Sequence, residues 1–223
     1  MKVVFAQRFW REMLGPACLS GCLRQAGHTT TVVIAQTIPS LRDAILAEVP
    51  GLVGLYWCSD DHCFLSELVR ALKAVHPNLP VIAGGPHPTH NPQIIETVPL
   101  DAVCRGEGEA ALTEYVAALE AGGNGCDIKN LWVRVGTEIS RNPLRTPQQD
   151  LDEWPDPDRD LYARYGLLRT NPHRSVMAGR GCPYPCTFCF MPLLYDLQGR
   201  EGKALRWRRQ ERVVGELRYL RDH

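Results

Sequence analysis

The sequence has no excess of either charge and no long apolar run. Its 223 residues contain 25 Lys and Arg against 25 Asp and Glu, so no overall field favours a nucleic acid or an anionic membrane. No stretch approaches the roughly 20 apolar residues of a spanning helix, and the apolar run that follows Met1 is too short for a signal peptide. These absences predict a cytoplasmic protein without a nucleic-acid partner or a membrane span.

Short apolar runs rich in β-branched residues recur along the first half of the chain and alternate with segments of helical pattern. This alternation is typical of a parallel sheet with crossover helices. The second helical segment is expected to use Ser40 as its N-cap. We therefore predict a doubly wound α/β domain of the flavodoxin or Rossmann kind with five parallel strands. The predicted strands are residues 2–6, 30–35, 51–57, 80–84 and 101–104, and the predicted helices are residues 18–27, 40–48, 64–76 and 107–123.

The chain changes character after about residue 130. The segment LWVRVGTEISRN predicts a hairpin across Gly136 and Thr137. Residues 141–174 are rich in Pro, Asp and Arg and have little periodicity, which predicts a connector. A strand at 175–179 and an amphipathic helix at 210–223 follow, too little to bury a core of their own. The predicted organisation is a domain at 1–140, a connector at 141–174 and an incomplete second unit at 175–223.

Three of the nine cysteines stand together in the segment GRGCPYPCTFCFM. Their C-x3-C-x2-C spacing leaves one position of a tetrahedral metal site without a local ligand. Thiolates suit zinc or an iron–sulfur cluster, and three thiolates on a four-iron cube leave one iron open. A zinc site would need a distant ligand such as His173. The trio is Cys182, Cys186 and Cys189, and we predict structural roles for Cys18, Cys22, Cys58, Cys63, Cys104 and Cys126.

The loops after the predicted strands lack two familiar ligand motifs. No G-x-G-x-x-G follows the first strand, which argues against a dinucleotide. The same loop has no Ser, Thr or Gly phosphate pattern of the kind a flavin site needs. Gly84 and Gly85 in GGPHPT leave room for a large flat ligand against the main chain. Glu107 and Glu109 in RGEGEA fit the first turn of a helix, where acidic residues complement the dipole.

The cysteine segment, with its RGCP start and the aromatic Phe188 before the third cysteine, resembles the cluster loop of radical S-adenosylmethionine enzymes. The resemblance implies that Cys182, Cys186 and Cys189 hold a 4Fe-4S cluster, and that S-adenosylmethionine chelates its open iron. It also implies that Phe188 contacts the adenine. Reduction by an external donor such as flavodoxin or ferredoxin would then cleave S-adenosylmethionine to a deoxyadenosyl radical.

The whole arrangement is similar to the cobalamin-binding subgroup of these enzymes. The likeness runs from Val3 to Leu220 and includes GGPHPT, RGEGE, the acidic connector and RGCP. It implies a cobalamin whose tail enters the sheet between strands. The D-x-H-x-x-G motif that ligates cobalt from below is absent after the first strand, and the partial match at Asp60 and His62 lacks its glycine. Cobalt is thus expected to have no protein histidine below it, and we expect His62 to be a loop or surface residue. The positions carried over as cobalamin contacts are Ser59, Gly84, Gly85, Pro86, His87, Gly106 and Glu107.

The resemblance implies the N-terminal part of a cobalamin-dependent radical S-adenosylmethionine enzyme that acts on a small-molecule substrate. Methyl transfer to an unactivated carbon is the expected parent reaction. A tetrapyrrole-type oxidative cyclisation stays open within the same class, and a non-catalytic flavodoxin-like module with a zinc loop stays open outside it. Residues 175–223 are expected to be the truncated start of a (β/α) barrel, so that this chain alone does not turn over substrate.

Overall fold

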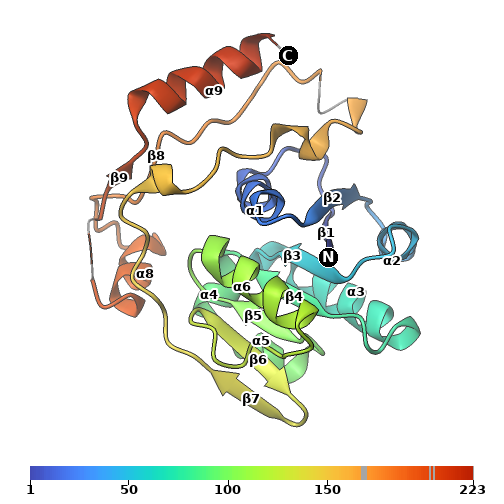
Figure 1. The fold of residues 1–223 in the computed structure, drawn as a ribbon. Coiled ribbons are helices and arrows are strands. Elements are labelled where there is room, and N and C mark those ends of the chain that lie inside the picture. The colour runs from blue at the N-terminus through green and yellow to red at the C-terminus, as the bar shows by residue number, and fades with distance from the viewer. Residues whose placement is uncertain (167–169, 201, 203, 223) are drawn as a thin grey trace.

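The computed structural model describes residues 1–166, 170–200, 202 and 204–222. Residues 167–169 of the predicted connector, and 201, 203 and 223 of the predicted barrel start, lie outside the described residues. The centre of the fold is a seven-stranded sheet in the order β2-β1-β3-β4-β5-β6-β7 (Figure 1). The strands are β1 (Lys2–Gln7), β2 (Thr29–Ile34), β3 (Leu52–Tyr56), β4 (Val81–Gly84), β5 (Ala102–Cys104), β6 (Leu131–Val135) and β7 (Glu138–Arg141).

The five predicted parallel strands are all present, which confirms the α/β fold class. The strand order reverses between β1 and β3, the kind of switch point at which open α/β sheets bind their ligands. The predicted hairpin also forms, as β6 and β7. Because β6 pairs antiparallel with β5, the hairpin extends the sheet by two strands beyond the five parallel ones.

Helices cover both faces of the sheet, and this burial explains why the strands are apolar throughout. Helices α1 (Leu14–Gln25) and α6 (Glu109–Glu120) pack on one face, and α2 (Ile38–Ala47) and α3 (His62–Val75) pack on the other (Figure 1). The prediction that Ser40 caps α2 is wrong. Thr37 is the N-cap, and its Oγ1 accepts a hydrogen bond from the Ser40 N–H at 3.4 Å. The helix starts earlier than predicted because Pro39 fits its first turn.

Two short helices follow β4, where the sequence predicts a loop. They are α4 (Pro86–His90) and α5 (Ile94–Thr97). Pro86 stands in the first turn of α4, where its missing N–H has no helical partner to lose. The GGPHPT segment is therefore a strand end, a glycine turn and a helix start.

The predicted connector packs against the first unit. It contains two short 3-10 turns, η2 (Leu151–Glu153) and η3 (Arg159–Tyr162). Tyr162 belongs to the core on the α1 face, and its hydroxyl donates to Gln7 Oε1 at 2.7 Å. A Cβ added to Gly21 of α1 would lie 2.6 Å from the carbonyl oxygen of Asp156, so this glycine lets the connector pass close to the helix.

The C-terminal part contains a two-stranded ribbon, β8 (Gly179–Arg180) and β9 (Arg206–Trp207), and the helices α8 (Met191–Leu197) and α9 (Gln210–Asp222). The prediction of a strand over 175–179 is wrong in extent, because β8 has only the short β9 to pair with. In Figure 1 these elements lie on the side of the molecule away from α2 and α3. Helix α8 buries none of its residues. Among the described residues, no helix is both long and apolar enough to span a bilayer.

Candidate functional site

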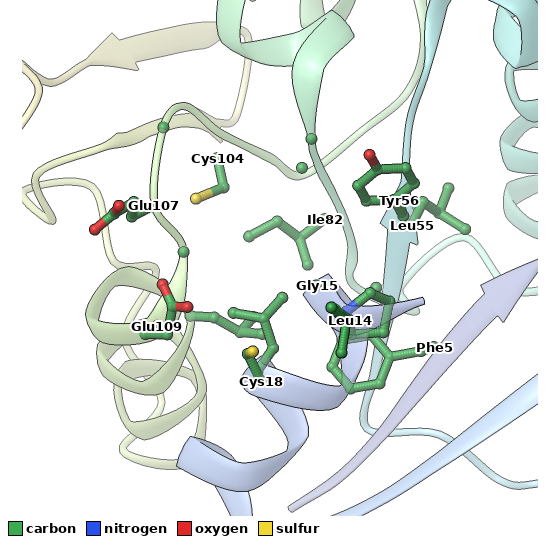
Figure 2. A pocket seen from close by; sticks show the side chains of 18 of the residues that line it. Phe5, Leu14, Gly15, Cys18, Leu55, Tyr56, Ile82, Cys104, Glu107 and Glu109 are labelled. Carbon is green, nitrogen blue, oxygen red and sulfur yellow. The ribbon is translucent and has the colours of Figure 1, made fainter. Parts of the chain in front are cut away.

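A pocket of about 300 Å³ opens between the N-terminal ends of α1 and α6. Its floor is a cross-strand row in which Phe5 of β1 pairs with Gly54 of β3, and Gly54 with Ile82 of β4. Figure 2 shows Ile82 near the middle of the pocket, with Glu109 on one side and Tyr56 on the other. The walls are mostly apolar, as expected where a ligand inserts a non-polar part into a protein.

Glycines keep the pocket open. A Cβ added to Gly54 would lie 2.9 Å from Phe5 Cδ1, closer than real carbon contacts allow. Gly85 has φ +109, and a Cβ there would lie 3.1 Å from the carbonyl oxygen of Trp57. Only glycine adopts such a backbone freely, so the turn after β4 keeps its bare main chain beside the pocket.

The seven predicted cobalamin positions lie at or just beyond the carboxyl ends of the parallel strands β3, β4 and β5. Ser59 lies in the turn η1 (Ser59–Asp61), and its Oγ is 2.9 Å from His87 Nδ1. The His87 N–H donates to the Trp57 carbonyl at 3.1 Å, and Pro86 precedes it in α4. The pocket is lined by Gly84, Gly85, Gly106 and Glu107, while Ser59, Pro86 and His87 stand outside its described lining.

The rings of His62 and His87 contact each other, with ring centroids 4.9 Å apart and planes tilted by 46°. His62 is the first residue of α3, so it does not lie in a loop, and its half-buried side chain lies partly at the surface. Burial, and then the neighbouring His62, lowers the pKa of His87 below its ordinary value. The Nε2 atom of His87 is covered by protein and has no hydrogen-bond partner among the described residues. Neither ring lines the pocket as described.

An ion-pair network that the sequence did not indicate lies at one end of the pocket. Arg180 of β8 donates to Glu109 and lies 3.5 Å from Glu107, and Arg206 of β9 lies 2.6 Å from Glu107. Burial alone would lower the pKa of Arg180, but the carboxylates outweigh it and raise that pKa above its ordinary value. Glu109 does stand in the first turn of α6, but its side chain is only 6% exposed. The motifs RGEGE and RGCP contain Glu107, Glu109 and Arg180, but they do not indicate that these residues pair in the fold.

Cys18 and Cys104 also line the pocket, which the sequence analysis did not predict. Both are buried, and burial raises the pKa of Cys18 to about 11 and that of Cys104 to about 12. At neutral pH they are therefore protonated thiols that act as small apolar groups. Of the other cysteines predicted to be structural, Cys22 is buried, Cys58 and Cys126 are half-buried, and Cys63 is exposed.

The cysteine loop begins at a tightly held turn. Gly181 has φ +98, and a Cβ there would overlap the carbonyl oxygen of Ala204, so no other residue fits. The Tyr195 hydroxyl accepts from the Cys182 N–H at 2.6 Å and lies 2.9 Å from the Cys182 carbonyl. Helix α8 thus holds both sides of the first cysteine through one phenol.

The three clustered cysteines are free thiols of intermediate exposure. The Cys189 N–H donates to the Cys186 carbonyl at 3.1 Å. Within the described ranges, no three His, Cys, Asp or Glu side chains stand together as a metal-binding group. The structure therefore does not gather Cys182, Cys186 and Cys189 around a common centre, and their donor chemistry alone fits a soft metal or cluster. Phe188 is 92% exposed.

Comparison with known proteins identifies the domain that contains the pocket. The B12 binding domain family matches residues 12–116. An uncharacterized methyltransferase of Pyrococcus horikoshii is 33% identical over 93% of this chain and 45% of its own length. The cobalamin-dependent radical SAM methyltransferase TokK of Streptomyces tokunonensis is 30% identical over 70% of this chain and 23% of its own. An anaerobic magnesium-protoporphyrin IX monomethyl ester cyclase of Synechocystis is 29% identical over 89% and 40%.

A solved structure has the same fold. The radical S-adenosylmethionine methyltransferase TsrM of Kitasatospora setae, solved with cobalamin and a [4Fe-4S] cluster bound, superposes with a TM-score of 0.75. The match covers 98% of this chain and 46% of TsrM at 18% identity. The chain spans less than half the length of each of these relatives.

Proposed function

The chain belongs to the radical S-adenosylmethionine proteins that carry a B12 binding domain, and from this premise we propose that it binds both cobalamin and an iron–sulfur cluster. The proposed parent reaction is methyl transfer to an unactivated carbon of a small molecule. The observation that carries the proposal is the apolar pocket, which opens where the strand order reverses and touches the segment that leads into the cysteine loop.

The pocket suits one part of a cobalamin molecule. About 300 Å³ is too small for a corrin ring, and its size and apolar walls match a flat aromatic tail group. A slot lies over β3 and β4 because Gly54, Gly84 and Gly85 have no side chains to fill it. We propose that Gly84, Gly85, Gly106 and Glu107 contact the tail, and that Ser59, Pro86 and His87 support the edge on which the corrin rests.

The same geometry supports the expectation that cobalt has no histidine below it. The Nε2 atom of His87 is covered by protein, and its Nδ1 is 2.9 Å from Ser59 Oγ. His62 is the first residue of a helix, and its Nδ1 is buried. In our proposal the protein therefore holds cobalamin through its tail and its ring edge.

We propose that Cys182, Cys186 and Cys189 hold a 4Fe-4S cluster and that Phe188 contacts S-adenosylmethionine. The thiols are free and partly accessible, and Gly181 and Tyr195 fix the start of their loop. When bound, cobalamin supplies the methyl group, and the cluster with S-adenosylmethionine supplies the radical. An external electron donor such as flavodoxin or ferredoxin would reduce the cluster.

The division into residues 1–140, 141–174 and 175–223 stays our proposal for the domains, with the last unit as the start of a barrel. Within the same class, the Synechocystis relative named as a cyclase supports oxidative cyclisation as a second candidate. Methyl transfer is favoured because the relatives with 30% identity or more are named as methyltransferases. A zinc-binding module without catalysis is the candidate outside the class.

Metal analysis tests the proposal. The chain is purified without oxygen, reconstituted with iron, sulfide and hydroxocobalamin, and assayed for iron, zinc and cobalt. We expect about four irons and about one cobalt per chain. Cys182→Ala should lose the iron and keep the cobalt, whereas the matched control Cys63→Ala, at an exposed free cysteine, should keep both. Zinc without cobalt would refute the proposal. To separate methylation from cyclisation, the bound cobalamin is first reduced to cob(I)alamin with titanium(III) citrate. Its attack on the deuterated methyl group of S-adenosylmethionine then gives methylcobalamin and S-adenosylhomocysteine, both detected by mass spectrometry.

A further inference from the structure

Arg180 takes part in two sites at once. Its side chain lines the apolar pocket together with Glu107 and Glu109. Its backbone lies in β8, two residues before Cys182, with only Gly181 between them. Because Gly181 is confined by the Ala204 carbonyl, a displacement of Arg180 would carry the start of the cysteine loop with it.

The ribbon of β8 and β9 is attached to the pocket through charges. Arg180 and Arg206 are register partners on neighbouring strands, and two like charges in that relation repel. Glu107 contacts both guanidinium groups, at 3.5 Å and 2.6 Å, and Arg180 also donates to Glu109. Two carboxylates that line the pocket therefore bind both arginines of the ribbon.

These charges are largely removed from water. The side-chain exposure is 16% for Arg180, 8% for Arg206 and 6% for Glu109. If the ribbon moved away, Glu109 would remain beside apolar walls without its cation, which is strongly unfavourable. A ligand in the pocket would pack against Arg180 and Met177 only while the ribbon is docked. A ligand that contacts one arrangement and not the other shifts the equilibrium between them.

We propose that Arg180 couples the occupancy of the apolar pocket to the position of the cysteine loop, so that a cobalamin tail and a cluster each strengthen the binding of the other. This inference rests on the proposed function, which supplies both ligands. Arg180 acts here as a positioning residue for the loop. The coupling must be reciprocal, because linkage requires that each ligand change the affinity of the other by the same factor.

The test measures the affinity of the full chain for hydroxocobalamin by absorbance without oxygen, before and after iron–sulfur reconstitution. We expect affinity to be about tenfold higher after reconstitution, within the usual range for coupled sites. Arg180→Gln should bind with the same affinity in both states, and Arg180→Lys should recover part of the ratio because it keeps the cation. The matched control is Arg200→Gln, since Arg200 pairs with Asp196 on the exposed side of the same unit.

Equal wild-type affinities in the two states, or a ratio that persists in Arg180→Gln, would overturn the coupling and leave cobalamin binding in place. Wild-type protein that binds no hydroxocobalamin in either state would instead remove the proposed function. Circular dichroism shows whether each variant folds. If Arg180→Gln does not fold, Glu109→Gln removes the same charge pair from the pocket side and should abolish the ratio equally.

Discussion

Replacing Gly54 by alanine should close the proposed tail site while leaving the fold intact. Gly54 lies in the middle of β3, where the strand otherwise carries large apolar residues. Its added Cβ would lie 2.9 Å from Cδ1 and 3.0 Å from Cε1 of Phe5. Carbon atoms prefer about 3.5–4.0 Å, so the ring must shift by roughly 0.5–1 Å. Because Phe5 lines the pocket, the open direction for that shift is into the pocket.

The substitution has two opposing effects on folding that partly offset each other. An alanine in a strand is more favourable than a glycine by about 0.5–1 kcal/mol, and overpacking costs about 1–3 kcal/mol. The free energy of unfolding should therefore fall by no more than about 2.5 kcal/mol. Affinity for cobalamin should fall at least about tenfold, equivalent to about 1.4 kcal/mol, because the aromatic base of the cobalamin tail would clash with the displaced Phe5 ring.

Urea unfolding and hydroxocobalamin titration of the same Gly54→Ala protein separate these effects. Adding Phe5→Leu, which removes the ring, should restore much of the affinity. Gly215→Ala is the control, because no atom outside its own helix lies within 4 Å of the added Cβ. It should leave affinity unchanged and stabilise α9 slightly. If Gly54→Ala bound cobalamin as tightly as the wild type, the slot over β3 could not be the tail site.

Three further predictions concern the remaining contacts. Tyr195→Phe removes the hydroxyl that holds the backbone of Cys182, so the loop should lose about 1–3 kcal/mol of local stability and retain less iron after gel filtration. Glu216→Gln removes the carboxylate that pairs with Arg159 and Arg208, and among the described residues it leaves Arg208 only the exposed Asp156 as a carboxylate partner. Hydrogen exchange in α9 should quicken, reflecting a loss of up to about 3 kcal/mol; unchanged exchange would contradict this. Burial lowers the pKa of His87 below its ordinary value of 6.5. As the pH falls through 6.5, the unfolded chain therefore binds a proton at His87 before the folded chain does, and the free energy of unfolding should decrease. The melting temperature should decline from about pH 7.5 to about pH 5.5, and less steeply in His87→Asn.

The features that the sequence determined by itself are local. Apolar runs between helical segments fixed the parallel strands, because a strand buried on both faces must be apolar along its length. Turn residues fixed the hairpin over Gly136 and Thr137. The spacing of Cys182, Cys186 and Cys189 indicated soft-metal chemistry, since thiolates are ligands that such metals and iron–sulfur clusters prefer. Their common use as cluster ligands stays a prediction.

The features that only the tertiary structure decided depend on residues far apart in the chain. The pocket needs Phe5, Gly54 and Ile82 in one cross-strand row, and the pairing register that aligns them is not encoded in any short segment. The ion pairs of Arg180 and Arg206 with Glu107 and Glu109 span about 70 to 100 positions. The sequence shows that these residues are charged, but it does not show that they lie close together in the fold. The contact between the pocket and the segment before the cysteine loop therefore exists only in the folded chain. In the unfolded chain these charged side chains are separated and hydrated, and folding removes their water and pairs them.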